Sequence, residues 1–298
     1  MPEYPDIVIY IESLRRFIQG QTLERVQIAH LFLLRTANPP VKTLEGKVLR
    51  DLERMGKRIV FAFDGDDFLV LHLMISGRLK WYPPERKVPA KGWLAALTFA
   101  NGTLLITESS TQKRASLHLV HGRDALAAFE RGGLEVMGTT TKEFRAALQA
   151  ENHTLKRALT DQRLFSGIGN AYSDEILHRA RLSPFLLTKN LTDEQIARLA
   201  EATKAVLGEW VERLRAEAGD GFPTKVTAFH EAMAVHGRYG QPCPVCGTKV
   251  QRIRYAANET NYCPHCQTED RLLADRALSR LLKDDWPRTV EELEERKR

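Results

Sequence analysis

The spacing of the cysteines constrains the fold of this 298-residue chain more than any other feature. All four lie in one short window as two Cys-x-x-Cys pairs, with sixteen residues between the pairs. Two such pairs at this separation deliver four thiolates to a tetrahedral zinc ion. Four thiolates leave no open coordination position, so the pattern predicts one structural Zn²⁺ with the ligands Cys243, Cys246, Cys263 and Cys266. Disulfides and redox pairs are the alternatives.

The segment between the two cysteine pairs predicts a small β-hairpin. It is too short to bury a core of its own, so its folding should depend on the metal. Arg252 and Arg254 would lie on this hairpin, where they either meet phosphates or are simply exposed to solvent. A secreted protein would scatter its cysteines to join distant segments by disulfides. The clustering therefore favours a reducing cytoplasm.

The first 125 residues read as a β-rich domain led by one helix. Residues 6–18 place apolar side chains on one face of a helix that Gly20 ends. Asn101-Gly102 joins two strand-like runs in a strong hairpin signal. The sequence has no GxGxxG motif and no P-loop, which argues against a nucleotide-cofactor enzyme. The predicted strands are 26–29, 58–63, 68–75, 97–100 and 103–107.

Helical patterns dominate from about residue 140. Thr140 with Glu143 and Thr192 with Gln195 form two capping boxes, and the second opens a long amphipathic helix. The predicted order of domains is a β domain, a hinge, a helical domain, a zinc finger and a C-terminal tail, with the boundaries 1–125, 126–150, 151–235, 236–270 and 271–298. The tail pairs a short amphipathic helix with nearly balanced charges, which is typical of a solvated appendage.

A glycine-containing turn, Ser166-Gly-Ile-Gly-Asn170, lies between two helical stretches. Gly167 and Gly169 let the backbone approach a partner closely, and the amides of the turn with the next helix N-terminus suit an anion. Asn170 is placed to cap that helix and to bind a phosphate. An ordinary interhelical turn is the alternative. The net charge of +6 permits a polyanionic partner and is equally typical of a solvated surface.

Membrane association is not indicated. No run approaches the roughly 20 apolar residues that span a bilayer. The first residues also lack the basic and apolar pattern of a signal peptide. We therefore expect no membrane partner.

Several motifs occur together in one order: Met1-Pro2-Glu3, MGKR at 55–58, HLMISGRL at 72–79, GIGNAYSDEIL at 167–177 and the four-cysteine hairpin. This set resembles the formamidopyrimidine-DNA glycosylase and endonuclease VIII family of base-excision repair enzymes, from residue 2 to about residue 268. The resemblance implies an α+β multidomain fold with an N-terminal β-sandwich, a helix-two-turn-helix module at 155–181 and a zinc-finger hairpin. It also implies a monomer that binds damaged or abasic DNA between its two halves.

The resemblance implies a catalytic role for the start of the chain. Removal of Met1 would leave Pro2 with a free secondary amine that attacks the sugar of a damaged nucleotide. Glu3 would be the general acid, and Lys57 would hold a phosphate near the lesion. Asp6 stands where the family usually has glutamate. Without the resemblance, Pro2 reads as a stiffener of the helix start and Lys57 as an exposed lysine.

Other implied DNA contacts are partly altered. Lys156 and Asn170 match the phosphate and lesion contacts of the family. Ile75 occupies the counted position of the family's wedge methionine, and Met74 comes one residue early. The arginine and phenylalanine of a later loop align with Gln112 and Arg114, which leaves no aromatic wedge there. Asn258 replaces the arginine of the zinc hairpin.

The sequence therefore predicts a bifunctional DNA glycosylase and AP lyase, acting in the cytoplasm at the nucleoid. A non-catalytic binder of damaged DNA and an AP lyase with little glycosylase activity are the alternatives. Oxidised guanine, ring-opened purines and oxidised pyrimidines all remain candidate lesions. The altered wedge positions leave a preference for single-stranded or bubble DNA open.

Overall fold

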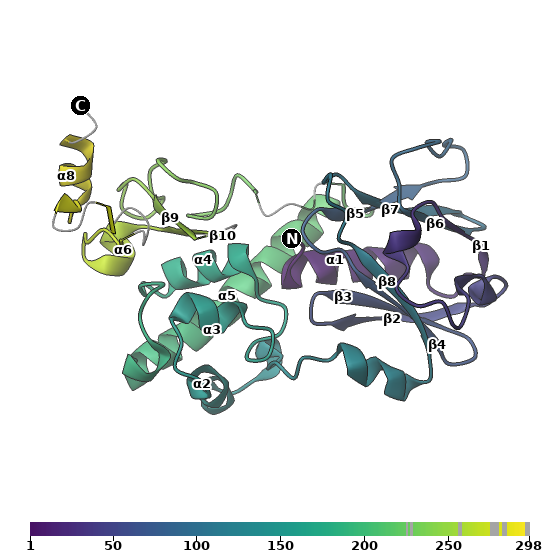
Figure 1. The fold of residues 1–298 in the computed structure, drawn as a ribbon, viewed down its shortest axis with the longest axis horizontal. Coiled ribbons are helices and arrows are strands. Elements are labelled where there is room, and N and C mark those ends of the chain that lie inside the picture. The colour runs from purple at the N-terminus through teal and green to yellow at the C-terminus, as the bar shows by residue number, and fades with distance from the viewer. Residues whose placement is uncertain (225, 227–228, 256–257, 275–279, 282–284, 296–298) are drawn as a thin grey trace. The chain divides into compact units, whose positions relative to one another are not determined.

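The computed structural model describes residues 1–224, 226, 229–255, 258–274, 280–281 and 285–295. The chain divides into two compact units (Figure 1). The first unit combines Met1–Arg131 with Glu209–Thr227, and the second combines Gly132–Gly208 with Ala228–Arg298. The long helix α5 (Asp193–Ala218) starts in the second unit and ends in the first. Contacts thus group the end of this helix with the first unit, whereas the sequence places 151–235 in a single domain.

The first unit is a sandwich of two four-stranded antiparallel sheets (Figure 1). One sheet has the order β1 (Leu23–Ile28), β6 (Ala95–Phe99), β7 (Gly102–Glu108) and β5 (Gly77–Tyr82). The other has the order β2 (Leu49–Met55), β3 (Arg58–Phe63), β4 (Asp67–His72) and β8 (Ser116–His121). Buried side chains of both sheets and of helix α1 (Tyr4–Ile18) form one apolar core. The predicted β-sandwich is confirmed.

Three strands have no counterpart in the sequence patterns. In β2 only Leu49 and Leu52 are buried, because the other positions carry charged or half-buried side chains. β5 and β8 are likewise short and mixed in burial. The predicted strand 68–75 is wrong at its end, since β4 stops at His72 and the next residues form a turn.

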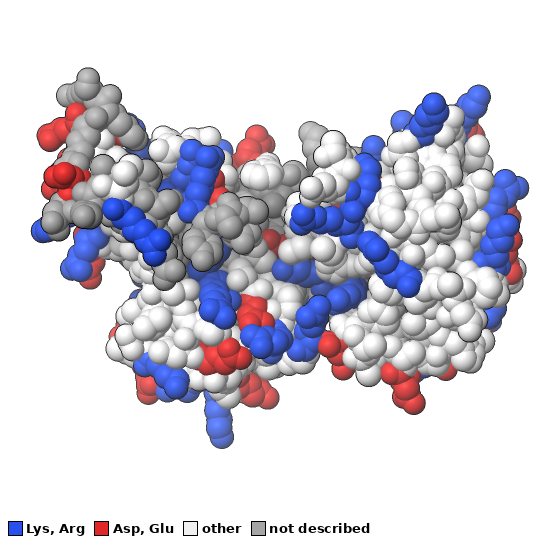
Figure 2. Space-filling view, viewed as in Figure 1, with Lys and Arg blue, Asp and Glu red and all other residues white. Residues whose placement is uncertain are grey.

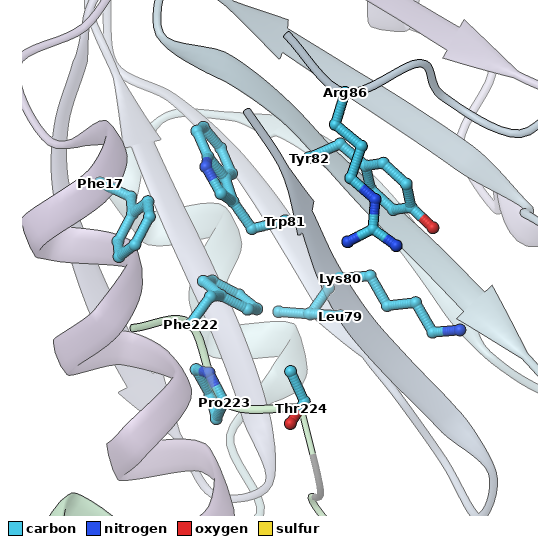
Figure 3. A pocket seen from close by; sticks show the side chains of 9 residues that line it. All are labelled: Phe17, Leu79, Lys80, Trp81, Tyr82, Arg86, Phe222, Pro223 and Thr224. Atoms are coloured by element: carbon cyan, nitrogen blue, oxygen red, sulfur yellow. The ribbon is translucent and has the colours of Figure 1, made fainter. Parts of the chain in front are cut away.

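The segment that follows α5 is held against the first sheet by aromatic rings. Phe222 lies 6.5 Å from Trp81 and 5.8 Å from Phe17, measured between ring centroids. These rings, with Tyr82 and Arg86, line a pocket of about 480 Å³ beside the C-terminal end of α1 (Figure 3). Because the rings come from three separate parts of the chain, they fix the segment's course after the helix ends.

The second unit is built on helices α2 (Thr141–Gln149), α3 (Leu155–Thr160), α4 (Asn170–Arg179) and the first part of α5. Both predicted capping boxes are present: Glu143 and Thr140 bond reciprocally, as do Gln195 and Thr192. Short 3₁₀ turns lie at Val136–Gly138 and Thr188–Asn190 in this unit, and at Leu31–Leu33, Val41–Leu44 and Arg123–Phe129 in the first unit.

The finger region of the second unit contains β9 (Gln251–Tyr255), β10 (Asn258–Tyr262) and helix α6 (Pro264–Thr268). The two strands pair antiparallel as the predicted hairpin. The amphipathic helix predicted for the tail, over 273–282, lies largely outside the described residues. Helix α8 (Val290–Glu295) follows it and has no predicted counterpart. Leu273 donates its backbone N–H to the Tyr262 hydroxyl at 2.8 Å, and Lys249 pairs with Glu294. These tail residues therefore contact the finger, while α8 itself has no buried residue.

Candidate functional site

The start of helix α1 places several polar side chains in a buried position. The backbone N–H of Glu3 donates to the Asp6 carboxylate at 2.7 Å, and Pro5 occupies the first helical turn. Pro2 is buried, and Glu3 and Asp6 are each 2 % exposed. Two carboxyl groups with so little contact with water are costly to ionise unless they are hydrogen-bonded or paired. The first residues are therefore held in place by the helix rather than left as a free end.

Burial and nearby charges shift the pKa values of the N-terminal amine and of Asp6. Burial is the main cause that lowers the pKa of the N-terminal amine at Met1. Burial also raises the pKa of Asp6 to about 7. Arg78, which the sequence reasoning did not single out, opposes protonation of both groups through its positive charge. Arg78 lies in the run HLMISGRL at 72–79, and its place in this motif is the signal that identifies it in the sequence.

Lys57 lies in the turn between β2 and β3, after Gly56 with a φ of 60°. Lys57 is only 6 % exposed. Its positive charge helps to lower the pKa of the N-terminal amine. The structure thus brings Pro2, Glu3 and Lys57 to one neighbourhood. Figure 2 shows Lys and Arg side chains gathered at the edge of this unit where Figure 1 marks the N-terminus.

A tight turn after β4 presents Ile75 to solvent. Ile75 is 53 % exposed, and Met74 beside it is half-buried with a φ of 53°. A side chain at Gly77 would collide with the carbonyl oxygen of Leu73, because its Cβ would lie 2.2 Å away. The turn therefore requires glycine at this place. It also ends the strand predicted over 68–75 before Met74 and leaves Ile75 as the projecting apolar residue.

A buried carboxylate joins this turn to the loop that follows β7. Glu108 is 6 % exposed, and it accepts hydrogen bonds from the backbone N–H groups of Arg114 and Ala115 and from the Ser76 hydroxyl. The Arg114 guanidinium in turn donates to the Gln112 side chain at 2.9 Å. Sequence reasoning missed Glu108, since an acidic residue at a strand end carries no distinctive pattern.

The glycine turn of the second unit differs from the prediction in one respect. Gly169, not Asn170, is the N-cap of α4, and the Asn170 amide donates to the backbone oxygen of Glu259 in the finger at 2.9 Å. The predicted capping role of Asn170 is therefore wrong. Gly167 does require glycine, because its φ is 81°, and its N–H donates to the Gln162 side chain at 3.0 Å.

Lys156 is buried beside this turn. Its ammonium lies 2.5 Å from the Asp174 carboxylate and donates to the backbone oxygen of Asn170 at 2.7 Å. The second Asp174 oxygen lies 2.7 Å from His236. This network fixes Lys156 at the turn and leaves it 9 % exposed. The structure thus places Lys156 beside the turn that contains Gly167, Gly169 and Asn170.

The four cysteine sulfur atoms fit a zinc ion. They lie within 4.8 Å of one another, and three of the pairs are 3.4, 3.6 and 3.9 Å apart. Zinc–sulfur bonds of about 2.3 Å in a tetrahedron require sulfur atoms roughly 3.8 Å apart. The Val245 N–H also donates to Cys243 Sγ at 3.4 Å, which is compatible with a metal-bound thiolate. The chain therefore holds one structural zinc.

The hairpin arginines have partners within the finger. Arg252 lies over the Tyr239 ring at 4.1 Å, and both Arg252 and Arg254 pair with Glu259. Asn258 begins β10 opposite Tyr255. Glu259 accordingly neutralises part of the charge that the sequence assigns to the hairpin.

Helix α4 also contacts the finger directly, through residues that sequence reasoning missed. The Glu175 carboxylate accepts the backbone N–H groups of Ala234, Val235 and His236 at 2.7 to 2.9 Å. His178 Nε2 lies 3.2 Å from Cys243 Sγ. The only signal in the sequence was the weak apolar periodicity of this helix, which indicates that its polar side chains have structural partners.

Three family models match the chain. The formamidopyrimidine-DNA glycosylase N-terminal domain matches residues 1–115, its H2TH domain matches 135–218, and the zinc finger found in FPG and IleRS matches 240–268. Among the described residues, no helix is long and apolar enough to cross a membrane.

Curated relatives and solved structures agree with these models. Formamidopyrimidine-DNA glycosylases of Heliobacterium modesticaldum and of Thermus thermophilus are both 34% identical over 90% of this chain, covering 100% and 99% of their own lengths. A complex of the Lactococcus lactis Fpg with abasic-site DNA has a TM-score of 0.79 at 25% identity, with 89% and 99% of the two chains covered. The MutM (Fpg) protein of Thermus thermophilus gives 0.75 at 32% identity, with 89% and 98% covered.

Proposed function

We propose a residue-level mechanism from the premise that the chain belongs to the formamidopyrimidine-DNA glycosylase family and is a DNA glycosylase of base-excision repair. AP lyase activity is typical of this family. The observation that carries the mechanism is the buried group of Pro2, Glu3 and Asp6 at the start of α1. The substrate is DNA that contains a damaged base or an abasic site.

The nucleophile is the amine of Pro2, exposed when Met1 is removed. The same surroundings that lower the pKa of the Met1 amine would keep the Pro2 amine unprotonated at neutral pH. Its lone pair attacks C1′ of the damaged nucleotide, and the base leaves with the electrons of the glycosidic bond. Opening of the sugar ring converts the adduct into an iminium ion. The iminium acidifies the C2′ proton, and loss of this proton breaks the bond from C3′ to its phosphate oxygen.

Glu3 and Lys57 assist this chemistry in different ways, Glu3 by transferring protons and Lys57 by its positive charge. Glu3 donates a proton to the sugar ring oxygen as the ring opens and takes up a proton in the elimination. Asp6, already bonded to the Glu3 backbone at 2.7 Å, fixes the start of the helix and hence the nucleophile. Lys57 holds the phosphate beside the lesion. The zinc ion takes no part in these steps and stabilises the finger.

Access to C1′ requires the damaged nucleotide to leave the base stack, at a cost of a few kcal/mol. The exposed side chain of Ile75 is placed to enter the gap, with Gln112 and Arg114 on the neighbouring loop. Glu108 bonds to both segments and so keeps the three side chains in register. In the second unit, the turn at Gly167 and Gly169 with Lys156 and Asn170 contacts DNA phosphates, and Arg252, Arg254 and Asn258 do so from the finger.

This function has a cellular setting that we propose with it. An enzyme whose substrate is chromosomal DNA works where that DNA lies, so we place this protein in the cytoplasm at the nucleoid. One chain holds every residue that the mechanism uses, and we propose a monomer as the active form.

Borohydride trapping tests the nucleophile. An abasic duplex should give a covalent adduct whose crosslink maps to Pro2 by peptide mass spectrometry. Acetylation of the N-terminus, or the change Pro2→Gly combined with Glu3→Gln, should abolish strand cleavage. A crosslink on a lysine, or full cleavage by the blocked protein, would overturn the mechanism. Tight, salt-sensitive binding without any adduct would select a non-catalytic binder instead.

The wedge assignment has a paired test. Ile75→Ala should lower base excision from duplex DNA about tenfold, equivalent to about 1.4 kcal/mol, and should leave abasic cleavage in single strands unchanged. Met74→Ala is the matched control, since its side chain is half-buried. Equal losses in both variants, or equal losses on both substrates, would remove Ile75 from the wedge role. Glu108→Ala should reproduce the Ile75→Ala pattern, because it frees both loops.

A further inference from the structure

Helix α4 reaches the zinc site through a histidine that none of the steps above uses. His178 is 6 % exposed, Cys243 is 3 % exposed, and His178 Nε2 lies 3.2 Å from Cys243 Sγ. We propose that His178 is a positioning residue of the zinc site, whose Nε2–H donates a hydrogen bond to the metal-bound Cys243 thiolate. This bond ties the metal to the helix that follows the DNA-binding turn.

The chemistry of the pair supports this direction of donation. A zinc-bound thiolate keeps negative charge and has acceptor capacity, whereas a neutral imidazole has one N–H donor. Charge-assisted hydrogen bonds of this kind are stronger than neutral ones. Cys243 Sγ already accepts the Val245 N–H at 3.4 Å, so His178 supplies a second donor from a different part of the fold.

Further contacts make the same connection between α4 and the finger. Glu175, one turn before His178, accepts three backbone N–H groups of the segment that leads into the finger. From the other side, Gln267 donates to the backbone oxygen of Leu182 at 3.0 Å and accepts the Cys263 N–H at 2.8 Å. The zinc site is thus braced by side chains from outside its own hairpin. Partners in this outer layer typically contribute 10–100-fold to metal affinity.

Nitrogen NMR of the zinc-loaded full chain tests the hydrogen bond in the unaltered protein. With histidine labelled in the ring, the His178 resonance should show Nε2 protonated and Nδ1 unprotonated. An Nε2 without a proton would overturn the proposal, because the ring would then be an acceptor or a direct zinc ligand. This measurement is independent of DNA and of catalysis, so it separates this inference from the proposed mechanism.

Variants measure the effect on the metal. His178→Phe removes the donor and should weaken zinc binding 10–100-fold in competition with a chromophoric chelator. With Co²⁺ in place of zinc, its sulfur-to-metal charge-transfer band should move to longer wavelength. His178→Gln, which places an amide N–H at the same reach, should restore most of both properties.

His265→Phe is the matched control. His265 lies between two of the ligands in sequence, yet its ring pairs with Asp270 at 3.0 Å and is exposed. This variant should keep zinc affinity and the cobalt spectrum. If His178→Phe binds zinc as tightly as His265→Phe with an unmoved band, His178 only fills space and the proposal is wrong.

Discussion

The β-sandwich is stabilised by different forces from those that stabilise the zinc finger. The sandwich shares one continuous apolar core between two sheets and α1, whereas the finger core is reduced to Val235, Val250 and the buried cysteines Cys243 and Cys263. Burial of apolar surface scales with size, so a region this small depends on its metal. The fold of the sandwich therefore depends on apolar packing, whereas the fold of the finger depends on the four thiolates that bind its metal.

Removal of zinc should give the largest difference in stability between the finger and the sandwich. Structural zinc contributes about 10–16 kcal/mol in isolated fingers, far more than any single side chain. Chelation should therefore unfold 236–268 and leave the sandwich folded, as measured by hydrogen exchange with mass spectrometry. Protection should fall in β9 and β10 and persist in β3 and β4. Loss of protection in all four strands would show that the sandwich also depends on the metal.

A cavity in the sandwich should produce the opposite pattern. Phe61 in β3 is fully buried, and Phe→Ala in a core costs about 3–5 kcal/mol. Phe61→Ala should lower the free energy of unfolding of the sandwich and leave the zinc content at one per chain. Val245→Ala, at an exposed finger position, serves as the comparison. A Phe61→Ala protein that loses zinc would contradict the separation of the two regions.

The free energy of unfolding of the sandwich should depend on pH through the protonation of Asp6. Burial raises the pKa of this carboxyl to about 7 from an ordinary value of 3.8, so the folded chain binds its proton more tightly than the unfolded chain does. The resulting stabilisation is complete below pH 3.8 and is lost as the pH rises to about 7. The wild-type free energy of unfolding should therefore fall across this window relative to Asp6→Asn. Glu24→Gln, on the exposed side of β1, should follow the wild type, and coincident curves for all three would contradict the assignment.

A helix cap gives the smallest expected effect. Thr140 Oγ1 accepts the Glu143 N–H at 3.3 Å, and loss of such a cap costs about 1 kcal/mol. Thr140→Ala should lower the melting temperature of the second unit, whereas Lys142→Ala on the same exposed helix should change the stability by less than about 0.5 kcal/mol. Differential scanning calorimetry distinguishes the two. An equal loss in both variants would mean that the cap contributes nothing beyond surface effects.

Features with a local cause were predictable from the sequence. The cysteine spacing, both capping boxes and the Asn101-Gly102 hairpin each depend on a few adjacent residues, and the structure contains all of them. The β-sandwich followed from the resemblance, as did the neighbourhood of Pro2, Glu3 and Lys57.

Features with a distant cause were not predictable in this way. Asn170 is the first residue of α4 and not its cap, and its amide bonds instead to Glu259, which is 89 residues away in sequence. Strand β2 has mostly charged residues and so carries no strand pattern of its own. It is a strand because it pairs with β3. Glu108 and His178 act on partners that no periodicity connects to them. Such roles depend on which segments meet, and a single sequence does not state this.

The first unit has a consequence for any attempt to dissect the protein genetically. It is completed by Glu209–Thr227, whose Phe222 packs on Trp81 and whose Val226 lies in the sandwich core. A fragment truncated after Arg131 would thus expose an unfilled apolar surface, and aggregation is its expected fate. A synthetic peptide spanning 209–227 should rescue such a fragment in trans, in the manner of split reporter proteins.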